Sequence, residues 1–61
     1  MLNGDQNVLD RLSYLYRERY GIEPTQSTKD NMLADWQLAN RQGFRYLTDP
    51  LADTIVSFAK P

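Results

Sequence analysis

The fold of this chain is decided by residues 5–20, DQNVLDRLSYLYRERY. Apolar side chains recur there at steps of three and four residues, so they share one face of a helix. This face holds Val8, Leu9, Leu12, Leu15, Tyr16 and Tyr20. Asn3 or Asp5 is expected to cap the first turn, and Gly21 offers the left-handed conformation that commonly ends a helix. The segment predicts an amphipathic helix over about 5–20.

A connection and a second helix follow. Pro24 restricts the preceding residue to extended conformations, and Ile22 is expected to pack back onto the core. Ser27 is a good N-cap, so we predict a second helix over about 28–42, ending before Gly43. Its buried face is expected to hold Met32, Leu33, Trp36 and Ala39.

A third helix is predicted over about 50–60. The sequence Thr48-Asp49-Pro50 predicts an N-cap at Asp49 followed by a proline at the first helical position, where its missing N–H costs nothing. Residues 44–47 are expected to form an extended link, because a lone strand would have nothing to pair with. The buried face of the third helix is expected to hold Leu51, Ala52, Ile55, Phe58 and Ala59.

Three amphipathic helices with short connections predict an all-α fold, a compact three-helix bundle, in a single domain covering residues 1–61. The sequence leaves one alternative open, a helical hairpin whose third helix docks on a partner chain. The expected core is Leu9, Leu12, Leu15, Tyr16, Met32, Leu33, Trp36, Ile55 and Phe58.

The composition argues against catalysis. The 61 residues include no cysteine and no histidine, which removes the usual thiol nucleophile, general base and transition-metal ligands. Asp49 and Asp53 form one tidy pair of carboxylates, but a helix start and its first-turn acid explain them better. We therefore expect no enzyme, no metal site and no cofactor.

Charge and hydropathy narrow the range of partners. Seven Lys and Arg against eight Asp and Glu give a net charge of −1, so no nucleic acid is expected as partner. The apolar runs fall far short of the roughly 18 to 20 residues of a membrane-spanning helix, so no membrane contact is expected. The N-terminal residues lack the pattern of a signal peptide. The expected location is the cytoplasm, of a cell or of an infected host.

Two helical surfaces are candidates for partner binding. Tyr14 falls on the polar side of the first helix together with Arg11, Arg17 and Glu18, and tyrosine and arginine are enriched at interfaces. The alternative is an ordinary solvated helix face. Leu38 falls on the polar side of the second helix, where a single exposed leucine is common and needs no explanation. If Val56 lies close to it, the two form a patch suited to self-association or partner binding.

The link before the third helix is a further candidate. Arg45 and Tyr46, between Phe44 and Leu47, form a pattern that can stack on nucleotides. We favour a simpler interpretation, in which Phe44 and Leu47 plug the end of the bundle while Arg45 and Tyr46 cover its rim.

These observations predict a small protein–protein interaction module: an adaptor, an inhibitor of a larger protein, or an assembly subunit, of the kind often encoded by phages and mobile elements. The expected partner is another protein of unknown identity, and a homo-oligomer is left open. The alternative function is a helix-turn-helix DNA-binding regulator. It is disfavoured because residues 43–48 exceed the usual turn and because Lys60 is the one basic residue of the third helix.

Overall fold

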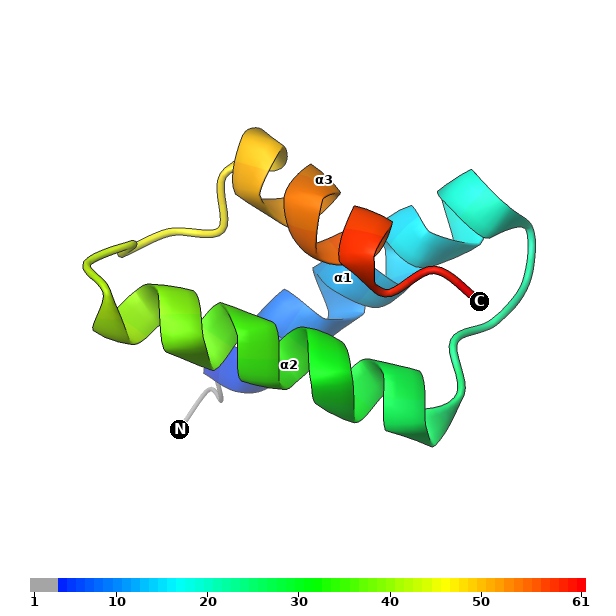
Figure 1. Ribbon diagram of the computed structural model, residues 1–61, viewed down its shortest axis with the longest axis horizontal. Coiled ribbons are helices and arrows are strands. Elements are labelled where there is room, and N and C mark those ends of the chain that lie inside the picture. Colours follow the sequence, from blue (N-terminus) through cyan, green and yellow to red (C-terminus); the bar gives the residue numbers. More distant parts are fainter. Residues whose placement is uncertain (1–3) are drawn as a thin grey trace.

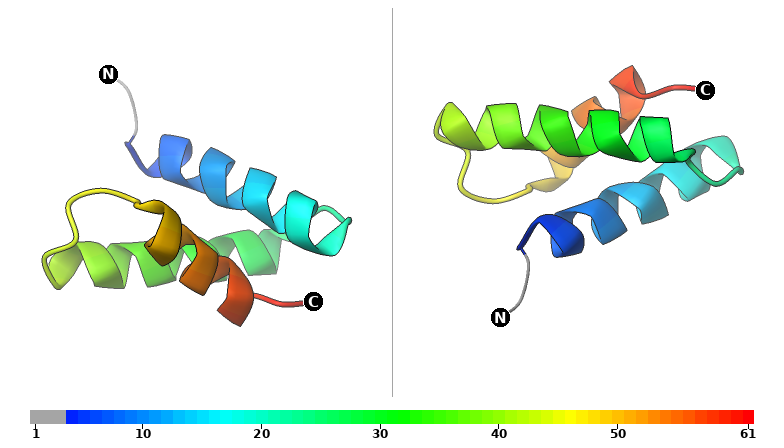
Figure 2. Two further views of the ribbon diagram at one scale, coloured as in Figure 1. Left: turned by 90° about the horizontal axis from the view of Figure 1, so that it is seen from above. Right: turned by 90° about the horizontal axis from the view of Figure 1, so that it is seen from below.

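The computed structural model describes residues 4–61. These residues form three helices, α1 (Gly4–Tyr20), α2 (Gln26–Arg41) and α3 (Asp49–Phe58), and no strand (Figure 1). Viewed down the shortest axis, α2 and α3 form a near layer with α1 behind them (Figures 1 and 2). All three helices pack against one another, so the three-helix bundle is confirmed and the third helix needs no partner chain to dock on.

The first helix ends as predicted, but the second begins earlier. Gly21 adopts φ +72°, and its N–H donates to the carbonyl of Arg17 at 2.8 Å. The expected cap at Ser27 is wrong, because Thr25 caps α2: its Oγ1 accepts from the backbone N–H of Thr28 at 3.1 Å. Both residue types suit the role, and the extended backbone at Thr25, after Pro24, decides between them. Of the two caps expected for α1, Asp5 is wrong because it lies within the first turn of the helix, and Asn3 lies outside the described residues.

Helix α3 begins one residue earlier than predicted. The assignment of Asp49 as its cap is wrong, because Thr48 has the extended backbone of an N-cap, with φ −72° and ψ 161°. Thr48 is the N-cap, its Oγ1 accepts from the N–H of Leu51 at 3.4 Å, and Pro50 lies in the first turn. No strand forms over residues 44–47, as expected. The regular helix ends at Phe58, so it is shorter than the range predicted from periodicity.

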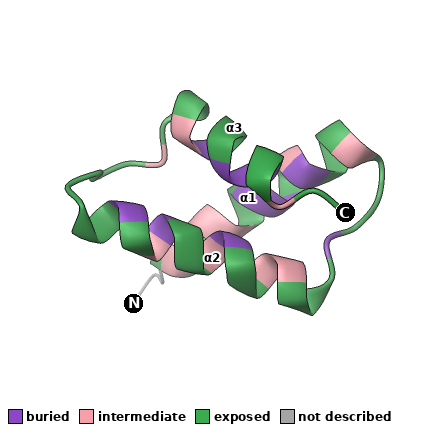
Figure 3. Ribbon diagram, viewed as in Figure 1, coloured by how far each residue is buried: buried purple, intermediate pink, exposed green. Residues whose placement is uncertain are grey.

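The core lies where the three helices meet (Figure 3). Five residues of the predicted core are buried: Leu12, Tyr16, Met32, Trp36 and Ile55. Ala52 and Val56 complete the buried cluster, and Leu15 and Leu33 are half-buried at its edge. Leu9 is half-buried on α1 but does not pack against this cluster. The core is therefore smaller than the sequence pattern suggests, and α3 contributes small and β-branched side chains to it.

Two apolar residues expected in the interior are exposed. Phe58 is 79% exposed, because α3 turns the stripe of Ala52, Ile55 and Val56 inward and leaves Phe58 roughly 100° away around the helix. Ile22 is 51% exposed, and the buried residue of that connection is Pro24. The core assignments of Phe58 and Ile22 are therefore wrong.

Polar contacts join α1 to α3. The hydroxyl of Tyr20 donates to the carbonyl of Val56 at 3.0 Å, and the ring of Tyr20 lies 4.7 Å from that of Tyr16, centroid to centroid. Ser13 is the one buried polar residue among the described positions, and no buried side-chain nitrogen or oxygen there lacks a hydrogen bond. The buried side-chain polar atoms of residues 4–61 are thus all paired, and the candidate sites described below lie on the surface.

Candidate protein-contact surfaces

The solvent face of α1 carries Tyr14, which is 52% exposed as predicted. The arginines near it are engaged within the chain. Arg11 Nη2 lies 2.6 Å from Asp49 Oδ1, and Arg17 Nη1 lies 3.1 Å from Glu23 Oε1. The two arginines expected to contact a partner therefore already have partners within the chain. Because both pairs are exposed, each contributes less than about 1 kcal/mol to stability.

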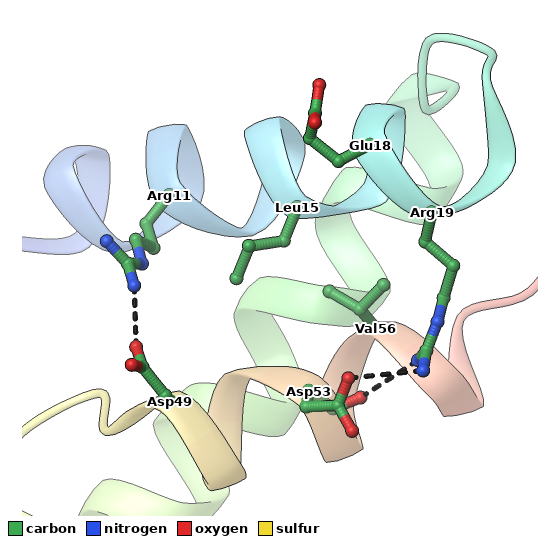
Figure 4. Close-up of a pocket in the computed structure, with 7 residues that line it drawn as sticks. All are labelled: Arg11, Leu15, Glu18, Arg19, Asp49, Asp53 and Val56. Carbon is green, nitrogen blue, oxygen red and sulfur yellow. Dashed lines mark hydrogen bonds and ion pairs between the residues drawn. The ribbon is translucent and has the colours of Figure 1, made fainter.

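A cleft of about 420 Å³ separates α1 from α3 (Figure 4). The Arg11–Asp49 pair spans it at one position, and Arg19 spans it at another, with Nη2 3.2 Å from Asp53 Oδ1. Arg19 also donates to Ser57 Oγ. The complete lining is Arg11, Leu15, Glu18, Arg19, Asp49, Asp53 and Val56.

The chemistry of this cleft is structural. Both carboxylates on the α3 side face an arginine from α1, which explains the Asp49 and Asp53 spacing as a docking device for α3. Glu18 points away from the cleft into solvent (Figure 4). Among residues 4–61, no group of three or more His, Cys, Asp or Glu side chains is placed to hold a metal ion. The cleft joins two helices and offers no free charged group at its centre.

The link before α3 borders a second, open hollow. Arg45 and Tyr46 are exposed, with Tyr46 77% accessible, and Leu47 packs against the core. Phe44 is 48% exposed, and its carbonyl accepts from Asn40 Nδ2 at 3.0 Å. The predicted plug is therefore correct for Leu47 and wrong for Phe44, because the backbone contact to α2 fixes this loop outside the bundle.

A groove between α2 and α3 holds the most exposed apolar surface of the two helices. Leu38 is 54% exposed and Phe58 79% exposed, and both line a hollow of about 560 Å³. Its remaining lining is Asp35, Ala39, Gln42, Thr54 and Ile55. We call the two exposed side chains, with the buried Ala39 and Ile55 between the helices, the Leu38–Phe58 patch.

The patch was only half anticipated from the sequence. Leu38 is exposed as predicted, but Val56, its expected neighbour, is only 2% exposed and faces α1. The exposed neighbour of Leu38 along the groove is Phe58 instead. The sequence signal that could have identified Phe58 is weak: it lies on the edge of the apolar stripe of α3, at an angle that only the packing of α3 resolves.

The predicted contact residues are thus distributed over separate surfaces. Arg11 and Glu18 line the α1–α3 cleft, while Arg45 and Tyr46 line the hollow beside the link. Leu38 belongs to the α2–α3 groove. No single surface contains all the predicted contact residues, so the side chains exposed on each surface decide which one is the best candidate site.

No protein-family model, curated protein sequence or solved structure matches this chain. Within residues 4–61, no helix combines the length and the apolar character needed to cross a membrane.

Helix α3 (DPLADTIVSF) carries two aspartates and no basic residue, and residues 42–48 separate it from α2. Nothing in this arrangement favours a recognition helix, which needs basic groups for phosphate contacts.

Proposed function

We propose that this protein is a non-catalytic protein–protein interaction module that contacts its partner through the Leu38–Phe58 patch. One observation carries the proposal: a phenylalanine and a leucine, both more than half exposed, border the same groove. Exposed apolar side chains gathered over a hollow are typical of protein contact sites. The proposal covers an adaptor, an inhibitor or an assembly subunit.

The groove supplies what an interface centre requires. Ala39 and Ile55, 8% and 4% exposed, form an apolar floor, and Phe58 stands beside it as an aromatic anchor. Covering Phe58 and Leu38 completely is worth about 3 kcal/mol before the cost of association is subtracted. Thr54 and Gln42 add polar groups at the edge, in keeping with the apolar centre and polar rim of protein interfaces.

The other surfaces support this function less well. A partner that uses the arginines beside Tyr14 has to compete with Asp49 and Glu23 for them. A catalytic role is not favoured, because the sequence contains no histidine or cysteine and because Asp49 and Asp53 are both paired with arginines. The patch, by contrast, is left exposed by the described residues, 4–61.

A capture experiment with paired variants tests the proposal. The chain carries a tag at its N-terminus, at the other end of the sequence from Phe58, and is used to capture proteins from the cells that produce it. Phe58→Ser and Leu38→Ser are each expected to lower the recovered partner at least about ten-fold, as at interface hot spots. Tyr14→Ser removes a comparably exposed side chain from α1 and is the matched control. Equal recovery with all three variants and the wild type contradicts the proposal.

A further inference from the structure

We infer that the partner seated on the Leu38–Phe58 patch is a second copy of this chain, related to the first by a two-fold axis. The inference rests on the proposed function, because it names the occupant of the same surface. Three features of the described residues favour a copy over an unrelated protein: a protrusion beside a hollow, the extent of the face, and the placement of two charges.

The protrusion and the hollow lie on the same face. Phe58 is 79% exposed, and it borders the groove between Leu38 and Ile55. In an isologous dimer each subunit presents the same surface, so each Phe58 can enter the groove of the other copy. The groove, at about 560 Å³, has room for a phenyl ring from the second subunit beside its own lining. Both anchors are then covered by one symmetric contact.

The face is large enough for a stable interface. The molecule measures 30 × 25 × 18 Å along its principal axes. Specific interfaces bury about 600–1,000 Å² on each partner. Among the faces of the molecule, only one bounded by the two longer axes, 30 × 25 Å, falls within this range. The α2–α3 layer forms one such face (Figures 1 and 2). The groove is lined entirely by this layer and its Gln42 cap, so the patch lies where a dimer can reach the required area.

The charges beside the patch complement those of a copy. Asp35 and Arg41 are both exposed and lie about one turn before and one turn after Leu38. Within residues 4–61 neither has an ion-pair partner. A two-fold axis that passes near Leu38 and is perpendicular to α2 runs the two α2 helices antiparallel, so the Asp35 end of one helix meets the Arg41 end of the other. Because the two-fold axis repeats this contact, the dimer holds two pairs of opposite charge, each between Asp35 of one copy and Arg41 of the other.

Sedimentation equilibrium of the complete chain, from about 10 µM to about 1 mM, tests the inference. We expect a reversible monomer–dimer equilibrium for the wild type. Phe58→Ser and Leu38→Ser are each expected to raise the dissociation constant at least about ten-fold. Asp35→Arg should weaken the dimer as well, and Asp35→Arg combined with Arg41→Asp should recover it, since the pair is then reversed. Tyr14→Ser is the control and should stay within about two-fold of the wild type.

The outcomes separate the two proposals. A wild type that stays monomeric at about 1 mM overturns the second copy as occupant, as do patch variants that dimerise like the wild type or a Tyr14→Ser variant that loses dimerisation equally. If a monomeric chain still captures a different protein through Phe58, the proposed function stands and only the dimer is wrong. If the patch variants capture as much as the wild type, the proposed function itself fails. Circular dichroism at low concentration confirms that each variant is folded.

Discussion

Leu12→Ala is expected to unfold most of the protein at room temperature. Leu12 is 0% exposed and packs at the centre of the core, where truncation to alanine costs about 2–5 kcal/mol. A chain of this length draws only about 3–5 kcal/mol of net stability from a single core without staples, so the loss is comparable to the whole. Urea denaturation followed by circular dichroism measures it.

Leu38→Ala is the matched control, since it makes the same substitution at a position that is 54% exposed. We expect it to cost less than about 1 kcal/mol, because most of the removed surface is already in water. Equal destabilisation by the two variants, measured at a concentration where the chain is monomeric, contradicts the assignment of Leu12 to the core and Leu38 to the surface.

Ala52→Leu is expected to displace α3. Ala52 is 0% exposed and faces the core, so three added carbon atoms have no space to enter. Overpacking of this kind typically costs about 1–3 kcal/mol and shifts the backbone. The hydrogen bond from the Tyr20 hydroxyl to the carbonyl of Val56 depends on the position of α3 against α1, so it should weaken when α3 is displaced. Urea denaturation gives the energy, and amide exchange at residues 49–58 reports whether α3 loosens.

The control for this overpacking is Ala34→Leu, at an exposed position of α2. Both substitutions replace alanine by leucine within a helix, so their effects on helix propensity are small and similar. Ala34→Leu should leave the denaturation midpoint nearly unchanged. A midpoint that falls as far as that of Ala52→Leu shows that the burial of Ala52 is not the cause.

The helices themselves were predictable from the sequence because their signals are local. The apolar spacing from Val8 to Tyr20 specifies α1, Gly21 ends it, and Thr48 with Pro50 begins α3. Such signals involve residues within one or two turns of each other and do not depend on the rest of the fold. Where two local signals compete, as at Thr25 and Ser27, the sequence does not decide between them.

The candidate site was less predictable because it depends on how the helices pack. The rotation of α3 about its own axis buries Val56 and exposes Phe58, and contacts of α3 with α1 and α2 set this rotation. The ion pairs of Arg11 with Asp49 and of Arg19 with Asp53 join residues far apart in the sequence. Leu38 was expected on the surface, but its exposed neighbour emerged only once α2 and α3 were placed side by side.

If the proposed function is correct, another protein chain covers the Leu38–Phe58 patch when the molecule functions. The most direct measurement replaces Phe58 by a photo-crosslinking phenylalanine analogue in the living producer cell, with the same analogue at Tyr14 for comparison. We expect an efficient crosslink from position 58, to a product of twice the chain's mass if the occupant is a second copy, and little crosslinking from position 14. If position 58 gives no crosslink, or no more crosslink than position 14, in a chain that is folded and present at its normal level, the patch is not covered by protein and the proposed function is contradicted.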